Sequence, residues 1–134
     1  MFWKISSQLA KLMDSQDAYQ LGLHELHHNQ KKDAPSGTAV TLAEYMIAAS
    51  TRFHGWHARE TMDFSSMNSI PISSERKGDI PGIHSVEYRS AHDRILLTHE
   101  AFSRSGFVEG VVRAAEWLKG RKGVYGMDDL FSKD

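Results

Sequence analysis

Apolar residues near the start of the chain recur at intervals of three and four positions. That spacing places them on one stripe of an amphipathic helix, so a helix is predicted from Phe2 to about Gln16. The apolar positions are Phe2, Ile5, Leu9, Leu12 and Met13. No Ser, Thr, Asp or Asn precedes Phe2 to cap this helix, which indicates that it belongs to a longer element.

In the next segment, apolar residues recur at every second position. Tyr19, Leu21 and Leu23 alternate with Gln20, Gly22 and His24, which predicts a strand running toward His27. A Pro-containing turn over residues 33–37 follows. The histidines of residues 24–28 are therefore expected at the end of a strand and in the loop after it.

A second helix is predicted directly after this turn. Ser36 is a suitable N-cap for a helix from Gly37 to about Ser50, because its side chain can accept a hydrogen bond from a free amide of the first turn. The apolar side of this helix includes Val40, Ala43, Met46 and Ile47.

The pattern in the second half of the chain predicts strands followed by a helix. Residues 51–71 have weak periodicity, and no element is predicted there. The predicted strands are Ile72–Lys77, His84–Ser90 and Arg94–Phe102, the last two joined as a hairpin. Ser105 is the expected cap of a helix from about Gly106 to Lys119, with Gly120 ending it. Strands and helices without strict alternation indicate an α+β domain with a mixed β-sheet.

Composition narrows the class of protein. A chain of 134 residues, 40% of them hydrophobic, suits one globular domain. A formal net charge of −1 gives no general attraction for nucleic acid or for an anionic membrane. The absence of cysteine excludes disulfides and thiolate metal sites. The sequence also has neither the long apolar run of a membrane span nor a segment resembling a secretion leader. The expected location is the cytoplasm.

The stretch His24-Glu25-Leu26-His27-His28 matches the zinc-protease pattern H-E-x-x-H. In a helix, His24 and His28 would lie about 6 Å apart on one face and could share an ion. In a strand they would be about 13 Å apart, too far for easy joint ligation. The period-two pattern before His24 favours the strand. A small zinc hydrolase using His24, Glu25 and His28 remains the alternative hypothesis.

The same region also suggests an anion site. His27, His28, Lys31 and Lys32 precede a predicted helix start, whose free amides and positive dipole end favour an anion. Gly37 lets a ligand approach the backbone, and Thr38 adds a hydroxyl. A small polycarboxylate or phosphate could bind there, with a histidine placed to transfer a proton. The competing interpretation is an ordinary helix cap beside a solvated loop.

Residues 25–39, ELHHNQKKDAPSGTA, resemble the E-x-H-H-x-x-K-x-D-A-P-S-G-T-A signature of 4-hydroxy-tetrahydrodipicolinate reductase, also called dihydrodipicolinate reductase. The resemblance continues through residues 76–84 (RKGDIPGIH), 97–101 (LTHEA), Arg104, 114–118 (AAEWL) and 123–127 (GVYGM). It implies a C-terminal domain whose mixed sheet carries helices on one face. It also implies an NAD(P)H-dependent reduction of a cyclic dicarboxylate in lysine and diaminopimelate biosynthesis.

The resemblance implies roles for five residues. His27 matches the proton donor/acceptor, and Lys31 matches a lysine that donates a proton and binds substrate. His28 matches a substrate contact. Gly37 and Thr38 match the backbone and hydroxyl that hold a substrate carboxylate. No metal is expected, and His84, His92 and His99 receive no role.

One part of the family pattern is absent from the sequence. No G-x-G-x-x-G turn for a dinucleotide exists here, so residues 1–134 are interpreted as the substrate-binding and oligomerisation domain without the nucleotide-binding half. NADPH or NADH would serve the full-length enzyme, none is expected on this chain, and the chain alone should not turn over.

The resemblance further implies a homotetramer formed through the sheet. On that basis Val86, Tyr88, Ile95 and Leu97 are either interface or monomer core, and the sequence leaves both open. A non-enzymatic oligomerisation or anion-binding module is a further alternative.

Overall fold

The computed structural model describes residues 1–61, 64 and 68–132 and divides the chain into two compact units. Unit 1 is Met1–Phe102 and unit 2 is Ser103–Asp134. Part of the segment in which no element is predicted, residues 62–63 and 65–67, lies outside the described residues. The two units are described separately below.

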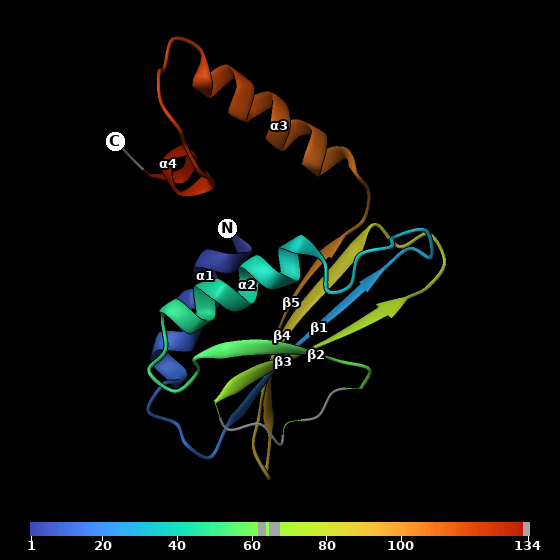
Figure 1. The fold of residues 1–134 in the computed structure, drawn as a ribbon, viewed down its shortest axis with the longest axis vertical. Helices are drawn as coiled ribbons and strands as arrows, with labels where there is room; N and C mark the ends of the chain where they lie inside the picture. Colours follow the sequence, from blue (N-terminus) through green and yellow to red (C-terminus); the bar gives the residue numbers. More distant parts are fainter. Residues whose placement is uncertain (62–63, 65–67, 133–134) are drawn as a thin grey trace. The chain divides into compact units, whose positions relative to one another are not determined.

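Unit 1 is built on one mixed sheet of five strands in the order β2-β3-β1-β4-β5 (Figure 1). The strands are β1 (Gln20–His27), β2 (Gly55–Arg59), β3 (Ser69–Arg76), β4 (Gly82–Arg89) and β5 (Arg94–Ala101). Strands β1 and β2 both run parallel to β3, whereas β4 runs antiparallel to β1 and β5. The predicted α+β class with a mixed sheet is confirmed.

Two helices of unit 1, α1 (Phe2–Met13) and α2 (Gly37–Ala48), lie side by side over one face of the sheet (Figure 1). Successive strand residues point to opposite faces of the sheet, and the apolar side chains of β1, β3 and β4 lie on this face. The buried core consists of Ala10, Met13, Leu21, Leu23, Ala39, Leu42, Ala43, Met46, Phe53, Ile70, Ile72, Val86 and Tyr88.

The helix-covered face becomes polar toward the C-terminal end of β1. Leu23 lies between Ile72 of β3 and Val86 of β4. Two residues farther along, Glu25 lies between Ser74 and His84 in the same register. Because side chains on one face recur every second residue, Glu25 follows Leu23 into the interior rather than into solvent. Its side chain is fully buried.

Some element boundaries differ from those predicted. Helix α1 ends at Met13 rather than near Gln16, and β3 begins at Ser69 rather than Ile72. Strand β2 lies where no element was predicted. It is an edge strand with no fully buried residue, so its sequence lacks the apolar alternation by which a strand is found.

Two of the four candidate interface residues are in fact core. Val86 and Tyr88 are 0% and 1% exposed beneath the helices. Leu97 packs against the same cluster, whereas Ile95 is 39% exposed. The interface interpretation of Val86 and Tyr88 is therefore wrong, because both point to the face that α1 and α2 cover.

Unit 2 contains α3 (Ser105–Leu118) and a short α4 (Met127–Phe131). The predicted helix cap is wrong: the N-cap position is Arg104, no side chain caps the helix, and Ser105 is already helical. Gly120 has a φ of 80°, the left-handed conformation expected just after a helix end. Helix α4 was not predicted. Just before it, the ring of Tyr125 packs edge-on against Trp117 of α3.

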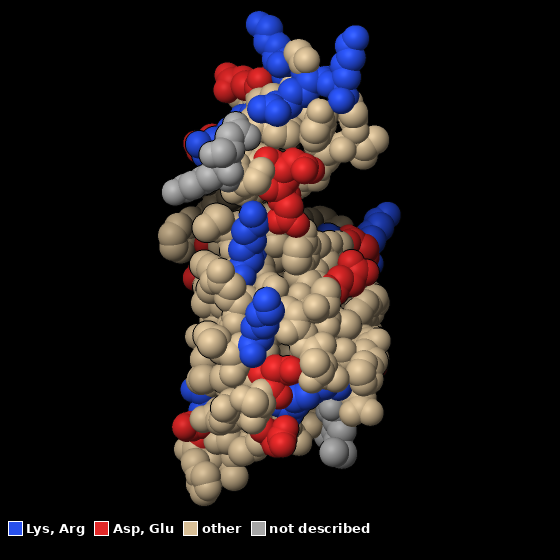
Figure 2. Space-filling model, turned by 90° about the vertical axis from the view of Figure 1, so that its left-hand side faces the viewer, with Lys and Arg blue, Asp and Glu red and all other residues tan. Residues whose placement is uncertain are grey.

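The surface agrees with the expectation from net charge. On the face shown in Figure 2, basic and acidic side chains of unit 1 are interspersed among uncharged ones. In the described part of the chain, no helix has the length and apolar character needed to cross a bilayer.

Candidate anion-binding site

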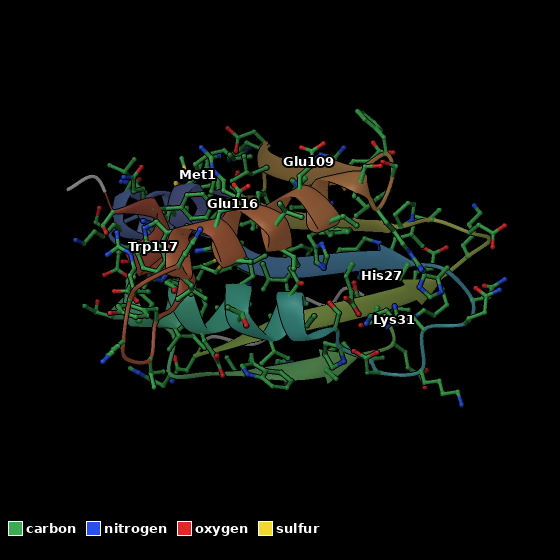
Figure 3. The ribbon with its side chains drawn as sticks, turned by 90° about the horizontal axis from the view of Figure 1, so that it is seen from above. Met1, His27, Lys31, Glu109, Glu116 and Trp117 are labelled. Carbon is green, nitrogen blue, oxygen red and sulfur yellow. The ribbon has the colours of Figure 1, made fainter. Side chains whose placement is uncertain are left out.

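A cluster of polar residues lies where β1 ends and the chain turns toward α2. Figure 3 shows His27 at the end of β1 and Lys31 in the following loop, at the same end of the sheet. The loop over residues 28–36 then leads into α2. The lysine and histidine predicted as site residues are therefore brought together by one strand-loop-helix connection.

Glu25 is the centre of this cluster. Its side chain is fully buried, and its Oε1 atom accepts hydrogen bonds of 3.0 Å from the backbone amide of Ser36 and from the guanidinium of Arg76. Its Oε2 atom lies 3.3 Å from His27 Nδ1 and 3.7 Å from His84 Nε2. One carboxylate thus contacts groups from β1, β3, β4 and the start of α2.

The carboxylate of Glu25 is held in its ionised form. Burial alone would raise its pKa, because a charge loses its hydration in the interior. Polar contacts from Ser36, Ser74 and Arg76 favour the anion and leave the pKa of Glu25 below its ordinary value. The site therefore contains a fixed negative charge beneath its histidines.

His27 is a nearly buried neutral imidazole. Burial lowers its pKa, the charge of Glu25 raises it, and the charges of Lys31 and Arg76 lower it further. The net effect is a pKa below the ordinary value. Near neutral pH this ring can accept a proton, which is the state a general base requires.

His84 was not predicted as a site residue, and the β1–β4 register brings it here. Its ring lies edge-on to His27 with centroids 5.0 Å apart, and its Nε2 atom is 3.2 Å from Ser36 Oγ. Burial and the neighbouring His27 lower the pKa of His84 to about 4. The only signal in the sequence is the period-two pattern that places His84 on the same strand face as Val86 and Tyr88.

Arg76, also missed, fixes the loop that carries Lys31. Its guanidinium donates to Glu25 and to two backbone carbonyls of the loop, those of Lys31 at 3.3 Å and Asp33 at 2.6 Å. Lys31 Nζ lies 2.8 Å from both carboxylate oxygens of Asp33. The ammonium is thus held by a largely exposed partner that a ligand carboxylate could replace.

The start of α2 has the local geometry predicted from the sequence. Ser36 is the N-cap, and its side chain accepts from the Ala39 amide as expected. Gly37 and Thr38 are exposed, and within the described residues their amides have no acceptor. Free amides at the positive end of a helix dipole bind anions. His28, half-buried, follows β1 directly.

The zinc site formed by His24, Glu25 and His28 is wrong. Residues 20–27 form a strand, so His24 lies on the face opposite to Glu25. Its Nδ1 atom is 2.7 Å from Ser73 Oγ on that opposite face. The H-E-x-x-H match therefore has no structural counterpart.

A different group, Glu25, His27 and His84, has ligand-type atoms within 4.8 Å of one another. The Arg76 guanidinium already neutralises the carboxylate at 3.0 Å. The charge of Lys31 also acts on both histidines. A cation would face both positive charges, so these surroundings disfavour a metal and suit an anion.

Gly82 should be required for the position of His27. A Cβ at Gly82 would lie 3.0 Å from His27 Nε2 and 3.3 Å from its Cδ2. We expect Gly82→Ala to displace the ring and to destabilise the fold by about 1–3 kcal/mol. Chemical denaturation and the His27 ring resonances would measure the two effects. Gly55→Ala, where a Cβ meets nothing within 4 Å, is the control; unchanged His27 resonances in Gly82→Ala would contradict the prediction.

Comparison with known proteins identifies relatives over nearly the whole chain. A family model described as "Dihydrodipicolinate reductase, C-terminus" matches residues 1–131. A protein of Christiangramia forsetii named 4-hydroxy-tetrahydrodipicolinate reductase is 39% identical over 132 residues, which cover 98% of this chain and 54% of that protein. A protein of the same name from Methanosarcina mazei is 40% identical over 131 residues, covering 97% and 48%.

A solved structure gives the same fold. Dipicolinate-bound dihydrodipicolinate reductase from Paenisporosarcina sp. TG-14 superposes with a TM-score of 0.64 at 24% identity. The match covers 96% of this chain and 50% of that one. The chain thus spans about half the length of the relatives it matches.

Proposed function

Because the chain belongs to the dihydrodipicolinate reductase family by its match to the C-terminal family model, we propose that it is the substrate-binding part of a 4-hydroxy-tetrahydrodipicolinate reductase. The reaction would be a reduction with loss of water in lysine and diaminopimelate biosynthesis, in the cytoplasm. The observation that carries the proposal is the convergence of His27, Lys31 and the α2 N-terminus at one end of the sheet.

Two groups are suited to the carboxylates of a cyclic dicarboxylate. The free amides of Gly37 and Thr38, with the Thr38 hydroxyl, would hold one carboxylate at the start of α2. Lys31 would exchange its partner Asp33 for a carboxylate of the ligand. His28, at the beginning of the same loop, would make a further contact. The dipicolinate-bound reductase from Paenisporosarcina has the same fold, which supports this ligand class.

His27 and Lys31 would carry the proton chemistry. His27 is neutral with a lowered pKa and so can take up a proton and return it. Lys31 carries its protons as an ammonium, from which one could be given to the substrate. Both groups belong to the same connection after β1, so the substrate would be positioned relative to both at once.

The residues of this chain do not fit a nicotinamide dinucleotide. The connection from β1 to α2, residues 28–36, contains no glycine, whereas a dinucleotide-binding turn needs several so that its backbone approaches the pyrophosphate. We therefore place NADPH or NADH binding in the half of the relatives that this chain does not match. On this proposal the chain by itself binds substrate and does not reduce it.

We also propose that the protein assembles as a homotetramer through the sheet. Among the described residues of unit 1, no helix covers the face opposite to α1 and α2, and on β5 this face presents Leu96, which is 50% exposed. Size-exclusion chromatography with light scattering of the 134-residue chain would measure the assembly.

Lys31→Ala should weaken binding of pyridine-2,6-dicarboxylate, a planar analogue of the substrate, far more than Lys32→Ala. Losing a charged hydrogen-bond donor is expected to weaken the affinity about ten- to hundredfold. Lys32 is the matched control, because it lies one residue away and its side chain is exposed. Its replacement should change affinity by about twofold or less.

Isothermal titration calorimetry on metal-free protein is the measurement, since this ligand also chelates zinc. Equal effects of the two substitutions would remove Lys31 from the site. Absence of saturable binding to the unsubstituted chain would contradict a substrate site in this half of the protein.

A further inference from the structure

We propose that Glu25 is the positioning residue of the site: its buried carboxylate holds His27 with the proton on Nδ1, which leaves Nε2 as the atom that accepts and returns a proton. This inference rests on the function proposed above and specifies how its histidine is prepared. It assigns to Glu25 no contact with the substrate.

The first observation is that two buried polar atoms face each other and neither makes a well-formed hydrogen bond to a described residue. Glu25 Oε2 and His27 Nδ1 are 3.3 Å apart, and the two side chains are 0% and 10% exposed. In the described part of the chain, neither atom has a hydrogen-bond partner of ordinary geometry. A small rotation of the imidazole would complete a hydrogen bond between them, and leaving both unsatisfied would be costly.

The second step concerns the charge of the ring. Burial lowers the pKa of His27, so near neutral pH the neutral form, with a proton on only one nitrogen, is favoured. If that proton were on Nε2, the Nδ1 lone pair would face the carboxylate anion in a buried place, which is repulsive. A proton on Nδ1 instead makes a charge-assisted hydrogen bond to Oε2. The partner of one ring nitrogen sets the protonation of the other, so Glu25 determines that Nε2 is the acceptor.

The second imidazole does not compete for this carboxylate oxygen. His84 Nε2 lies nearer to Ser36 Oγ, at 3.2 Å, than to Glu25 Oε2, at 3.7 Å. The other carboxylate oxygen, Oε1, is occupied by the Ser36 amide and the Arg76 guanidinium. These two donors fix the orientation of the carboxylate, so that Oε2 is aimed at His27.

The opposite edge of the imidazole is kept open by a glycine. A Cβ at Gly82 would approach His27 Nε2 to 3.0 Å, and the glycine leaves this space free. Glu25 on the Nδ1 side and Gly82 on the Nε2 side thus give the two ring nitrogens different surroundings. On this proposal Nδ1 is the nitrogen held by the carboxylate, and Nε2 is the nitrogen that exchanges a proton.

The test is the protonation of the His27 ring in the 134-residue chain, read by nitrogen-15 NMR through long-range couplings to the ring protons. We expect the Nδ1 resonance to be of the protonated type and the Nε2 resonance to be of the unprotonated type at neutral pH without ligand. The reverse assignment in the unsubstituted protein would overturn the proposal, whatever any variant shows.

Glu25→Gln tests the cause. The amide keeps the size of the side chain but removes the charge, so the fraction of the Nδ1–H form and the pKa of His27 should both fall. Dipicolinate affinity should fall about ten- to hundredfold, because the orientation of the ring is no longer fixed. Glu75→Gln, at an exposed carboxylate on β3, is the matched control and should leave the His27 spectrum unchanged.

The readouts separate this inference from the proposed function. An Nδ1–H form with no dipicolinate binding would retain the positioning role and contradict the substrate site. Dipicolinate binding with an Nε2–H form would support the substrate site and contradict the positioning role of Glu25. Should Glu25→Gln fail to fold, the spectrum of the unsubstituted chain decides the matter alone.

Discussion

Glu25→Ala is expected to lower the free energy of unfolding by about 3–5 kcal/mol, the effect of removing one partner of a buried ion pair. The substitution leaves the Arg76 guanidinium, 19% exposed, without its carboxylate. It also leaves the Ser36 amide without its acceptor. Urea denaturation followed by circular dichroism would measure the change as a lower midpoint at a similar m-value.

Two variants test whether the buried charge is the cause. Glu75→Ala, at a side chain 54% exposed on the neighbouring strand, should change stability by no more than about 0.5 kcal/mol. Arg76→Met in the Glu25→Ala background should cost less than Arg76→Met alone, because the charge left unpaired is then absent. Strictly additive effects would show that Glu25 and Arg76 are not coupled.

The free energy of unfolding should fall by about 3 kcal/mol as the pH decreases from about 6.5 to about 4. The pKa of His84 is lowered from 6.5 to about 4 by burial and by His27, and each unit corresponds to about 1.4 kcal/mol. Between pH 6.5 and 4, His84 is protonated in the unfolded chain but largely unprotonated in the folded chain. Acid therefore favours unfolding. Denaturation midpoints measured across this range would give the slope.

Other titrating groups around His84 add to this dependence in known directions. His27 also has a lowered pKa, so it destabilises the fold in acid in the same way. Glu25, whose pKa lies below its ordinary value of 4.5, contributes stability that is lost only at lower pH, as the folded carboxylate protonates. The charges of Lys31 and His99 also act on His84.

His84→Gln should reduce the slope between pH 6.5 and 4, whereas His92→Gln, in the exposed turn between β4 and β5, should preserve it. An unchanged slope in His84→Gln would assign the acid sensitivity to other groups.

The part of the site that could be predicted lies within one local connection. Ser36, Gly37 and Thr38 form a helix start through short-range rules of capping, and the structure places them there. The period-two pattern of residues 19–24 predicted β1, which also determined that His24 and Glu25 point to opposite faces. The burial of Glu25 could have been deduced from the same pattern, since it continues the positions of Leu21 and Leu23.

The rest of the site depends on contacts distant in sequence. His84 and Arg76 reach Glu25 through the pairing of β4 and β3 with β1. Strand register depends on packing of the whole sheet, and no local pattern states which residues will be opposite each other. The edge strand β2 was missed for a related reason, because without a buried face it has little pattern to detect.

The sequence by itself determined the local chemistry: a strand ending in histidines, a basic loop and a helix start suited to a carboxylate, because these follow from side-chain periodicity and capping over a few residues. Only the tertiary structure decided the charge balance of the site. It placed one buried carboxylate among Arg76, His27 and His84, and burial and distance determine which groups are charged.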